Sequence, residues 1–218
     1  MTVSSPFFAM LARMRLIQRW GLMRNTRAEN VQEHSLQVAI IAHALALISN
    51  RHHGGDFDAD RVAVLGMFHD ASEILTGDLP TPVKYGNDAI REAYKALERQ
   101  AERRLLELLP TDLREDYAPL LDSQRMSEAE RRLVKAADSI AGYLKCVEEA
   151  QAGNNEFRRA EAHLLAKIEA ACVDVPAVRD FMECYAPAFA LSLDELRCTL
   201  DDHTNREACP AAPASQAN

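Results

Sequence analysis

Two histidines and two aspartates have the residue types and settings of metal ligands. His69 and Asp70 are adjacent and follow the apolar run 62–68. His34 lies in an earlier apolar segment, and Asp138 lies in a later one. Burying a carboxylate without a partner is costly, and a cation is the simplest partner. Two imidazoles and two carboxylates are a plausible ligand set for one divalent metal ion.

The segments that carry these residues have the period of buried helices. Counting at 3.6 residues per turn places His34, His69 and Asp138 on the apolar stripes of their helices, so these side chains are expected to point inward. The stripe of His34 consists of Val38, Ile41, Ala42 and Leu45. The stripe of His69 consists of Val62, Leu65, Gly66 and Glu73, and that of Asp138 consists of Val134, Ala137 and Ala141. A single buried histidine is more often a hydrogen-bonded core residue than a ligand, so the prediction depends on the combination. His43, on nearly the opposite side of the same helix as His34, is interpreted as structural.

Helical patterns extend along almost the whole chain. They span residues 7–19, 30–49, 58–76, 87–109, 127–152, 154–172 and 177–185, and a short last helix follows Ser192. Asn30 with Glu33, and Ser127 with Glu130, have the spacing of capping boxes. Residues 78–82 are expected to be extended, because proline disfavours helix at and before its own position. Since no segment has a convincing strand pattern, we expect an all-α fold, a single helical bundle.

The composition favours one helical domain. The chain has 218 residues, of which 48% are hydrophobic, and only 8 Gly and 9 Pro. This composition predicts long helices and few tight turns. We expect one domain over residues 1–200 and a disordered Ala/Pro/Ser-rich tail over residues 201–218. The net charge of −8 argues against a nucleic-acid polymer as the main partner.

Cysteine usage and hydropathy predict a cytoplasmic protein that does not bind membranes. The five cysteines include no Cys-x-x-Cys pair, so neither a disulfide framework nor a zinc ribbon is expected. The longest apolar stretch, residues 38–48, is too short to span a membrane. Arginines but no acidic residues precede Glu29. We interpret this bias as an amphipathic first helix and not as a transit peptide, because no small-residue cleavage site follows it.

The combination of His34, His69-Asp70 and Asp138 resembles the H…HD…D signature of the HD-domain metal-dependent phosphohydrolases. Longer stretches are similar to the bacterial 5′-deoxynucleotidases, above all Arg19-Trp20 and the block Gly-Asp-Leu-Pro-Thr-Pro-Val-Lys-Tyr at 77–85. Further matching blocks are residues 29–38, 69–73 and 135–138. The resemblance covers about residues 6–196. It implies an HD-domain fold, a homodimer, and hydrolysis of deoxyribonucleoside 5′-monophosphates to deoxynucleoside and phosphate.

Four residues outside the ligand set have side chains suited to the other parts of such a reaction. Glu73, one turn after His69-Asp70, can act as general base on a metal-activated water. Arg19 offers a planar fork to phosphate oxygens. Trp20, the one tryptophan of the chain, can wall a sugar pocket against a ribose 2′-hydroxyl. Asp78, in a proline-stiffened loop, can accept a hydrogen bond from a sugar hydroxyl.

Each of these residues also has an ordinary explanation. The alternatives are a helix-end carboxylate, a solvated arginine, a core tryptophan and a turn-capping aspartate. The resemblance implies a wider set of substrate contacts, namely Arg19, Trp20, His34, Asp70, Asp78, Leu79, Pro80, Thr81 and Asp138. Lys84 is a weaker candidate for a contact with phosphate.

The spacing of the histidines predicts one metal ion per chain. HD phosphodiesterases with two metals need extra histidines between the HD pair and the last aspartate, and this chain has none between Asp70 and Asp138. Mixed nitrogen and oxygen ligands suit Zn, Mn, Co and Fe alike, so the metal is not identified. Two other functions compete with a 5′-deoxynucleotidase: an HD phosphohydrolase that acts on a dNTP or an alarmone, and a non-catalytic nucleotide sensor.

Overall fold

The computed structural model of the chain describes residues 4–84 and 86–202. Over these residues the structure is helical and contains no β-strand, and one isolated antiparallel bridge joins Gln18 to Asn30. The prediction of an all-α fold is therefore confirmed. The predicted disordered tail lies outside the described residues from 203 onward, and residues 201–202 belong to the last helix.

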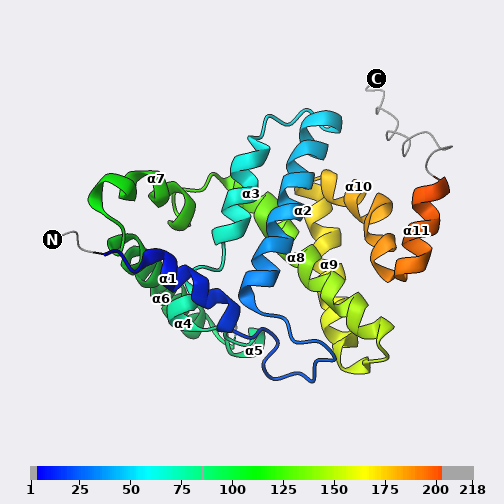
Figure 1. Ribbon diagram of the computed structural model, residues 1–218, viewed down its shortest axis with the longest axis horizontal. Helices are drawn as coiled ribbons and strands as arrows, with labels where there is room; N and C mark the ends of the chain where they lie inside the picture. Colours follow the sequence, from blue (N-terminus) through cyan, green and yellow to red (C-terminus); the bar gives the residue numbers. More distant parts are fainter. Residues whose placement is uncertain (1–3, 85, 203–218) are drawn as a thin grey trace.

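Figure 1 shows the helices in chain order. They are α1 (Phe7–Leu11), the 3₁₀ helix η1 (Ala12–Leu16), α2 (Val31–His52), α3 (Ala59–Phe68), α4 (Glu73–Thr76), α5 (Thr81–Lys84), α6 (Asp88–Glu107), α7 (Thr111–Leu121), α8 (Glu128–Gln151), η2 (Asn155–Phe157), α9 (Arg158–Asp174), α10 (Ala177–Cys184), η3 (Ala186–Ala190) and α11 (Leu193–Asp202).

Helix α2 lies at the centre of the fold and packs against both α3 and α8 (Figure 1). Helix α9 packs on α8, and α10 packs on α2. Leu45 of α2, Leu65 of α3 and Ile140 of α8 belong to one buried apolar core. The three helical segments that the sequence predicts to carry metal ligands therefore share a core, and burial of that core fixes them relative to one another.

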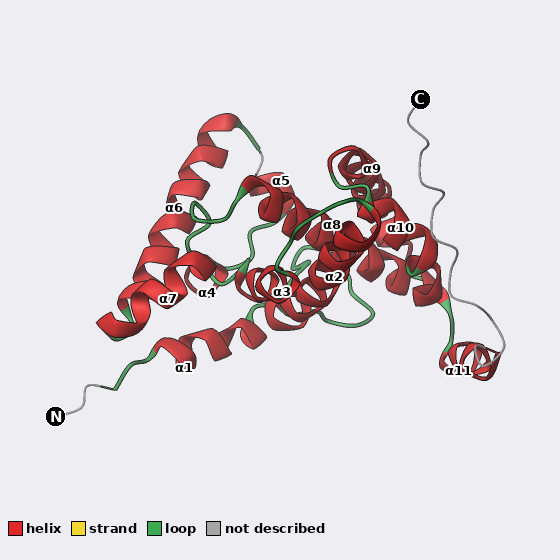
Figure 2. Cartoon of the chain, turned by 90° about the horizontal axis from the view of Figure 1, so that it is seen from above, coloured by secondary structure: helices red, strands yellow, loops and turns green. Residues whose placement is uncertain are grey.

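A second, smaller core lies where α1, α6 and α7 meet, on one side of the molecule (Figure 2). Phe7 and Leu105 belong to it, and so does Ala71. Because Leu65 belongs to the first core and Ala71 to the second, the short segment between them connects the two. The His69-Asp70 pair lies in this segment and is held from both sides.

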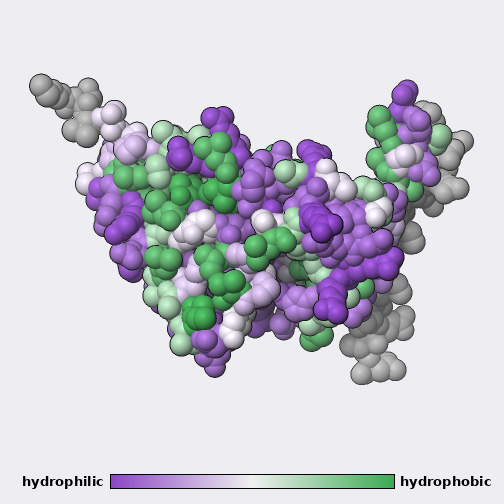
Figure 3. Space-filling model, turned by 90° about the horizontal axis from the view of Figure 1, so that it is seen from below, coloured by the Kyte–Doolittle hydropathy of each residue, from purple (hydrophilic) through white to green (hydrophobic). Residues whose placement is uncertain are grey.

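Hydrophobic side chains are also exposed on the half of the molecule that carries α4, α5 and α6. The large exposed residues of these helices are Leu75, Val83, Ile90 and Leu97. Figure 3 shows hydrophobic side chains gathered on the same half of the face that is seen from below. Grouped apolar residues on a surface are typical of contact sites for other molecules.

The third predicted helix is interrupted where its functional residues lie. The sequence predicts one helix over 58–76, but α3 ends at Phe68 and α4 begins at Glu73. Between them the backbone makes tighter bonds, from the amide of Ala71 to the carbonyl of Phe68 and from the amide of Glu73 to the carbonyl of Asp70. The prediction of a continuous helical face is therefore wrong for the segment after Phe68, because i→i+3 bonds rotate side chains differently from an α-helix.

Three other predictions of local structure need correction. The predicted first helix over 7–19 is instead α1 followed by η1, which ends at Leu16, because Gln18 pairs with Asn30. Helix α7 was not predicted, and it contains Pro119, a residue that normally interrupts a helix. The extended segment ends at Pro80, since α5 begins at Thr81. Arg19 and Trp20 thus lie on a loop that is paired to the start of α2.

Helix α2 is longer than the apolar stretch that the sequence analysis considered. With 22 residues, it is long and apolar enough to cross a membrane by length and composition alone. The helix is 56% buried over its most apolar window, and its neighbours are α3, α8 and α10. Core helices of bundles pass the same test of length and composition, so α2 is interpreted as the core helix of this fold.

Gly66 allows α3 to approach α2 closely. A Cβ atom at this position would lie 2.8 Å from the Cα of Ala39 and 3.0 Å from its backbone nitrogen. Backbone atoms cannot move aside as a side chain can, so only glycine allows this distance between the helices. The close approach brings the residues after α3 near the beginning of α2.

Replacing Gly66 by alanine is expected to force α2 and α3 apart. We predict that Gly66→Ala lowers the free energy of unfolding by about 1–3 kcal/mol, the usual cost of overpacking, as measured by urea unfolding. Gly142→Ala in α8 is the matched control. Its Cβ would meet Cδ1 of Leu164 at 3.3 Å, and that side chain can shift, so we expect stability within about 1 kcal/mol of wild type. Equal stabilities for the two variants would contradict the close-approach interpretation.

Candidate metal centre and substrate site

The four predicted ligands come together between α2, α3 and α8. Nε2 of His34 lies 3.0 Å from Oδ1 of Asp138 and 3.8 Å from Oδ2 of Asp70. Nε2 of His69 lies 3.0 Å from the same Asp70 oxygen. One ligand atom each from His34, His69 and Asp70 lies within 4.8 Å of the other two. This separation lets one ion reach all three atoms, and Asp138 joins the group through His34.

The donor atoms fit a divalent cation. Nδ1 of His69 lies 2.8 Å from the carbonyl oxygen of Gly66, and this bond keeps a proton on Nδ1, so Nε2 is the nitrogen that would lose its proton to bind a cation. Nε2 of His69 is buried and makes no well-directed hydrogen bond within the part of the chain that the structure describes, although Oδ2 of Asp70 lies 3.0 Å away. A buried ring nitrogen beside a carboxylate oxygen, with a second imidazole nitrogen near the same oxygen, is an arrangement that a metal ion would satisfy.

Electrostatic interactions keep the two aspartates ionised. Although burial opposes ionisation, His69, His34 and Arg19 hold the pKa of Asp70 well below its usual range. Burial likewise opposes ionisation of Asp138, but the hydrogen bond and charge of His34 lower its pKa to about 2. Both carboxylates are therefore in the charged form that binds metals.

Glu73 is a buried carboxyl group close to these charges. It is 4% exposed, and its Oε2 has no hydrogen-bond partner. Burial, followed by the negative charges of Asp70 and Asp78, raises the pKa of Glu73 to about 9. Glu73 therefore stands at a helix end, as the first residue of α4, but it is not solvated there.

Arg19 is held between carboxylates and is not a solvated arginine. Its Nε donates to Oε2 of Glu29 at 3.2 Å, and its Nη1 donates to Oδ2 of Asp70 at 3.3 Å. Burial alone would lower the pKa of Arg19, but Asp70, Asp138 and Glu29 raise it. The guanidinium therefore stays charged beside the predicted metal site, where it can meet an anion.

Trp20 has a backbone conformation that is unusual for a residue other than glycine. Its φ angle is 59°, in the left-handed region. The indole Nε1 donates to Oε2 of Glu29 at 2.8 Å, and the ring packs edge-on against Phe157 at 5.2 Å between centroids. The tryptophan thus contacts the core and also shares a hydrogen-bond acceptor with Arg19.

The loop after α4 brings Asp78 near the same charges. Gly77 has a φ angle of 72°, which glycine adopts freely and which turns the chain away from α4. Asp78, Leu79 and Pro80 are half-buried, and Thr81 is exposed at the start of α5. Burial raises the pKa of Asp78, and the positive charge of Arg19 opposes this change.

Two other residues from the sequence analysis have partners of their own. Lys84 forms an ion pair with Glu98 at 2.7 Å and lies 4.5 Å above the ring of Tyr94, so its ammonium group contacts α6. His43 lies 3.5 Å from the exposed Asp60 and does not belong to the ligand group. These contacts agree with the weak assignment of Lys84 and with the structural interpretation of His43.

Glu29 belongs to the site, but the sequence analysis gave it no role. Its carboxylate accepts hydrogen bonds from Arg19 and Trp20, and its Oε1 lies 3.8 Å from Nδ1 of His34. Glu29 precedes the first turn of α2 and follows no helical period, so periodicity could not reveal it. The available signal was its position next to the capping residue Asn30, in a block that also contains His34.

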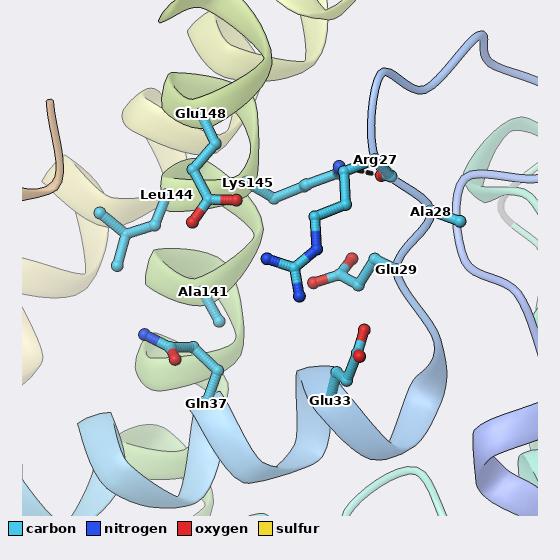
Figure 4. Close-up of a pocket in the computed structure, with 9 residues that line it drawn as sticks. All are labelled: Arg27, Ala28, Glu29, Glu33, Gln37, Ala141, Leu144, Lys145 and Glu148. Carbon is cyan, nitrogen blue, oxygen red and sulfur yellow. Dashed lines mark hydrogen bonds between the residues drawn. The ribbon is translucent and has the colours of Figure 1, made fainter. Parts of the chain in front are cut away.

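A buried ion pair on α8 fastens the loop that follows Trp20. Glu149 accepts from the amide and the hydroxyl of Thr26, at 2.9 and 2.7 Å, and pairs with Lys145. Lys145 also donates to the carbonyl oxygen of Arg27 at 2.6 Å (Figure 4). The loop lies over a hollow of about 150 Å³ between α2 and α8, and Glu29 lines its edge.

Comparisons with known proteins agree on one family. Residues 6–189 match the family described as 5′-deoxynucleotidase YfbR-like. The chain is 55% identical to 5′-deoxynucleotidase YfbR of Escherichia coli (strain K12 / DH10B) over 192 residues, which cover 88% of this chain and 96% of the relative. The same figures hold for the protein of that name from Escherichia coli (strain SE11).

Solved structures with low sequence identity share the fold. An HD-domain phosphohydrolase (lin2634) from Listeria innocua superposes with a TM-score of 0.73 at 22% identity, covering 92% of this chain and 98% of that one. The cyanophage S-2L HD phosphohydrolase (DatZ), described as bound to dA and one catalytic Zn²⁺ ion, superposes with a TM-score of 0.59 at 18% identity. That comparison covers 93% of this chain and 99% of the phage protein. The arrangement of helices is thus that of HD-domain phosphohydrolases.

Proposed function

Because the chain belongs to the YfbR-like 5′-deoxynucleotidase family, we propose that it hydrolyses deoxyribonucleoside 5′-monophosphates to deoxynucleoside and phosphate. The resemblance that the motifs predicted is thereby confirmed. The observation that carries the proposal is the placement of a charged Arg19 beside His34, His69 and Asp70, whose ligand atoms lie within 4.8 Å of one another. No observation favours a dNTP or alarmone hydrolase or a nucleotide sensor over this function.

We assign His34, His69, Asp70 and Asp138 as the ligands of one divalent cation per chain. The buried Nε2 of His69 beside Asp70 and the ionised state of both aspartates support the assignment. When bound, such a cation lowers the pKa of a coordinated water and polarises a phosphate oxygen. The zinc described for the phage phosphohydrolase agrees with this donor set, which also suits Mn, Co and Fe.

Arg19 is assigned to binding the phosphate, and Glu73 is assigned to proton transfer. Hydrolysis adds water across the bond between phosphorus and O5′, so a proton must leave the attacking water and a proton must reach the departing oxygen. The Arg19 guanidinium has N–H groups left over from Glu29 and Asp70, which can hold the phosphate. Glu73, which its raised pKa keeps protonated near neutral pH, gives its proton to the departing O5′, and the resulting carboxylate takes up the proton that the attacking water loses.

The 77–81 loop and Trp20 are assigned to the sugar. Asp78 accepts a hydrogen bond from a sugar hydroxyl, and Leu79, Pro80 and Thr81 complete the contact. Trp20 excludes the ribose 2′-hydroxyl by its shape. In addition, an indole has one donor and no acceptor, so it offers no partner to the proton of that hydroxyl. His34, Asp70 and Asp138 meet the substrate through its phosphate.

The enzyme is further proposed to be a cytoplasmic homodimer. The apolar residues that lie exposed on α4, α5 and α6 support a contact with a second copy of the chain. The cysteine usage, five cysteines with no Cys-x-x-Cys pair, supports the compartment. Light scattering coupled to gel filtration tests the dimer directly.

The first prediction from the proposed function concerns the metal. Chelation is expected to abolish phosphate release from dAMP, and His69→Ala and Asp138→Ala are expected to lose metal and activity together, because affinity at an open site depends on every ligand. His43→Ala is the matched control, a histidine of α2 that pairs with Asp60 at the surface, and it should keep both. Metal analysis and phosphate release measure the outcome. Full turnover by demonstrably metal-free protein would end this assignment.

The second prediction separates binding from proton transfer at Glu73. Glu73→Gln should keep the metal and bind dAMP, while kcat falls roughly 10²-fold or more, the usual scale for a lost general acid–base group. Metal content, a binding isotherm and steady-state kinetics on the same preparation measure this. Loss of metal would make Glu73 a ligand, and near-normal turnover would remove it from the mechanism.

The third prediction concerns sugar selectivity. Wild-type enzyme should release phosphate from dNMPs much faster than from NMPs, dNTPs or p-nitrophenyl phosphate. Trp20→Ala should narrow the ratio of kcat/KM for dAMP to that for AMP, chiefly by admitting AMP. Arg19→Ala should lower kcat/KM for dAMP and for AMP by the same factor, since both substrates carry the phosphate. If wild type hydrolyses dAMP and AMP at equal rates, or if Trp20→Ala leaves the ratio unchanged, Trp20 has no role in sugar selectivity and serves only in packing.

A further inference from the structure

The carboxylate of Glu29 contacts Arg19 and Trp20 and faces His34, three residues to which different roles are assigned above. Its Oε2 accepts from Nε of Arg19 at 3.2 Å and from Nε1 of Trp20 at 2.8 Å. Its Oε1 lies 3.8 Å from Nδ1 of His34. The side chain is 15% exposed. One anion therefore stands between the residues assigned to the phosphate, the sugar and the metal.

The backbone around Glu29 is fixed on both sides. Its carbonyl oxygen accepts from the amide of Arg19 at 2.9 Å, and the bridge between Gln18 and Asn30 pairs the two segments. Asn30 then caps α2, and its carbonyl oxygen accepts from the amide of His34. Little backbone freedom is left, so the direction of the Glu29 carboxylate is set by the fold.

Glu29 keeps the Arg19 guanidinium from turning entirely towards the metal ligands. Asp70 alone would engage two N–H groups on one edge of the guanidinium, because a carboxylate and a guanidinium prefer two parallel hydrogen bonds. With Nε bonded to Glu29 and Nη1 bonded to Asp70, the remaining N–H groups of Arg19 are unassigned. Those groups are the ones that a phosphate can use.

Glu29 also holds the indole of Trp20. The left-handed φ angle of 59° is a strained conformation that other contacts must maintain. The hydrogen bond from Nε1 is the polar contact that fixes the ring, in addition to its packing on Phe157. Without the negative charge of this acceptor the ring would keep its packing but be held less firmly, because a hydrogen bond to an ionised acceptor is stronger than one to a neutral acceptor.

Glu29 also lies near the place where a metal-ligating His34 would have the partner of its second ring nitrogen. Nδ1 of His34 is buried and without a hydrogen-bond partner. A histidine that binds metal through one nitrogen generally donates from the other to a carboxylate, carbonyl or water, which orients the ring. At 3.8 Å the Glu29 carboxylate is just beyond hydrogen-bond distance, and a small shift would close the gap.

We propose that Glu29 is a positioning residue that sets Arg19, Trp20 and His34 in one arrangement, so that phosphate binding, sugar selectivity and metal affinity depend on a single carboxylate. The proposal rests on the proposed function for the roles of these three residues. Glu29 does not touch the reacting atoms, and it acts through its neighbours.

The test compares Glu29→Gln with Glu33→Gln, in which the same change is made in the exposed first turn of α2. Trp20 is the single tryptophan of the chain, so indole emission and its quenching by acrylamide report on that side chain without background. Mn²⁺ affinity by calorimetry reports on His34. The third readout is the split between KM and kcat for dAMP, together with the ratio of kcat/KM for dAMP to that for AMP.

For Glu29→Gln we expect altered indole emission and quenching, Mn²⁺ affinity weaker by roughly 10- to 100-fold, a rise in KM larger than the fall in kcat, and a narrower dAMP-to-AMP ratio. Glu33→Gln should match wild type in all of these. The fluorescence and the Mn²⁺ affinity do not require turnover, so a failure of the proposed function is distinguishable from a failure of this proposal.

Wild-type emission, Mn²⁺ affinity and substrate ratio in a folded Glu29→Gln variant would overturn the proposal. If that variant does not fold, Glu29→Asp decides the question, because it keeps the charge and shortens the reach. Folded Glu29→Asp with a changed emission and weakened Mn²⁺ binding would support the positioning role. Wild-type values for both would overturn it.

Discussion

The structure depends on burying a group of opposite charges so that each is compensated. Asp70 and Asp138 are ionised next to His34 and His69, and Arg19 lies against Asp70 at 3.3 Å. Burying any of these groups alone would be strongly unfavourable. Together they compensate one another in part and leave ligand atoms for one more positive charge. The rest of the fold serves to bring these side chains, which are distant in sequence, to one place.

Two features of the scaffold accomplish this. Gly66 lets α3 approach the backbone of α2, and the segment after it is held between the two apolar cores, so His69 and Asp70 have little freedom. On the other side, the loop that carries Trp20 is fastened to α8 by the buried pair of Lys145 and Glu149. Rigid support from both directions is what a site with a defined geometry requires.

Much of this arrangement could be predicted from the sequence, because helical period and metal-ligand chemistry are local signals. The stripe on α2 placed His34 inside, and the capping box at Ser127 marked the start of α8, as the structure shows. The stripe on α8 predicted an inward Asp138, and this residue does reach His34 at 3.0 Å, but its side chain is 43% exposed. The pair at 69–70 was recognised from residue type. The parts that could not be predicted depend on tertiary contacts. They are the break after Phe68, the pairing of Gln18 with Asn30, and the hydrogen bonds that make Glu29 part of the site.

The most direct test of the account is a titration of metal-free protein with Mn²⁺ in which phosphate release from dAMP is followed. A single centre formed by His34, His69, Asp70 and Asp138 predicts that activity rises linearly and reaches its plateau at one equivalent per chain. Activity that is independent of added metal, or a plateau at two equivalents, would contradict the claim that these four residues form a single-metal phosphohydrolase centre.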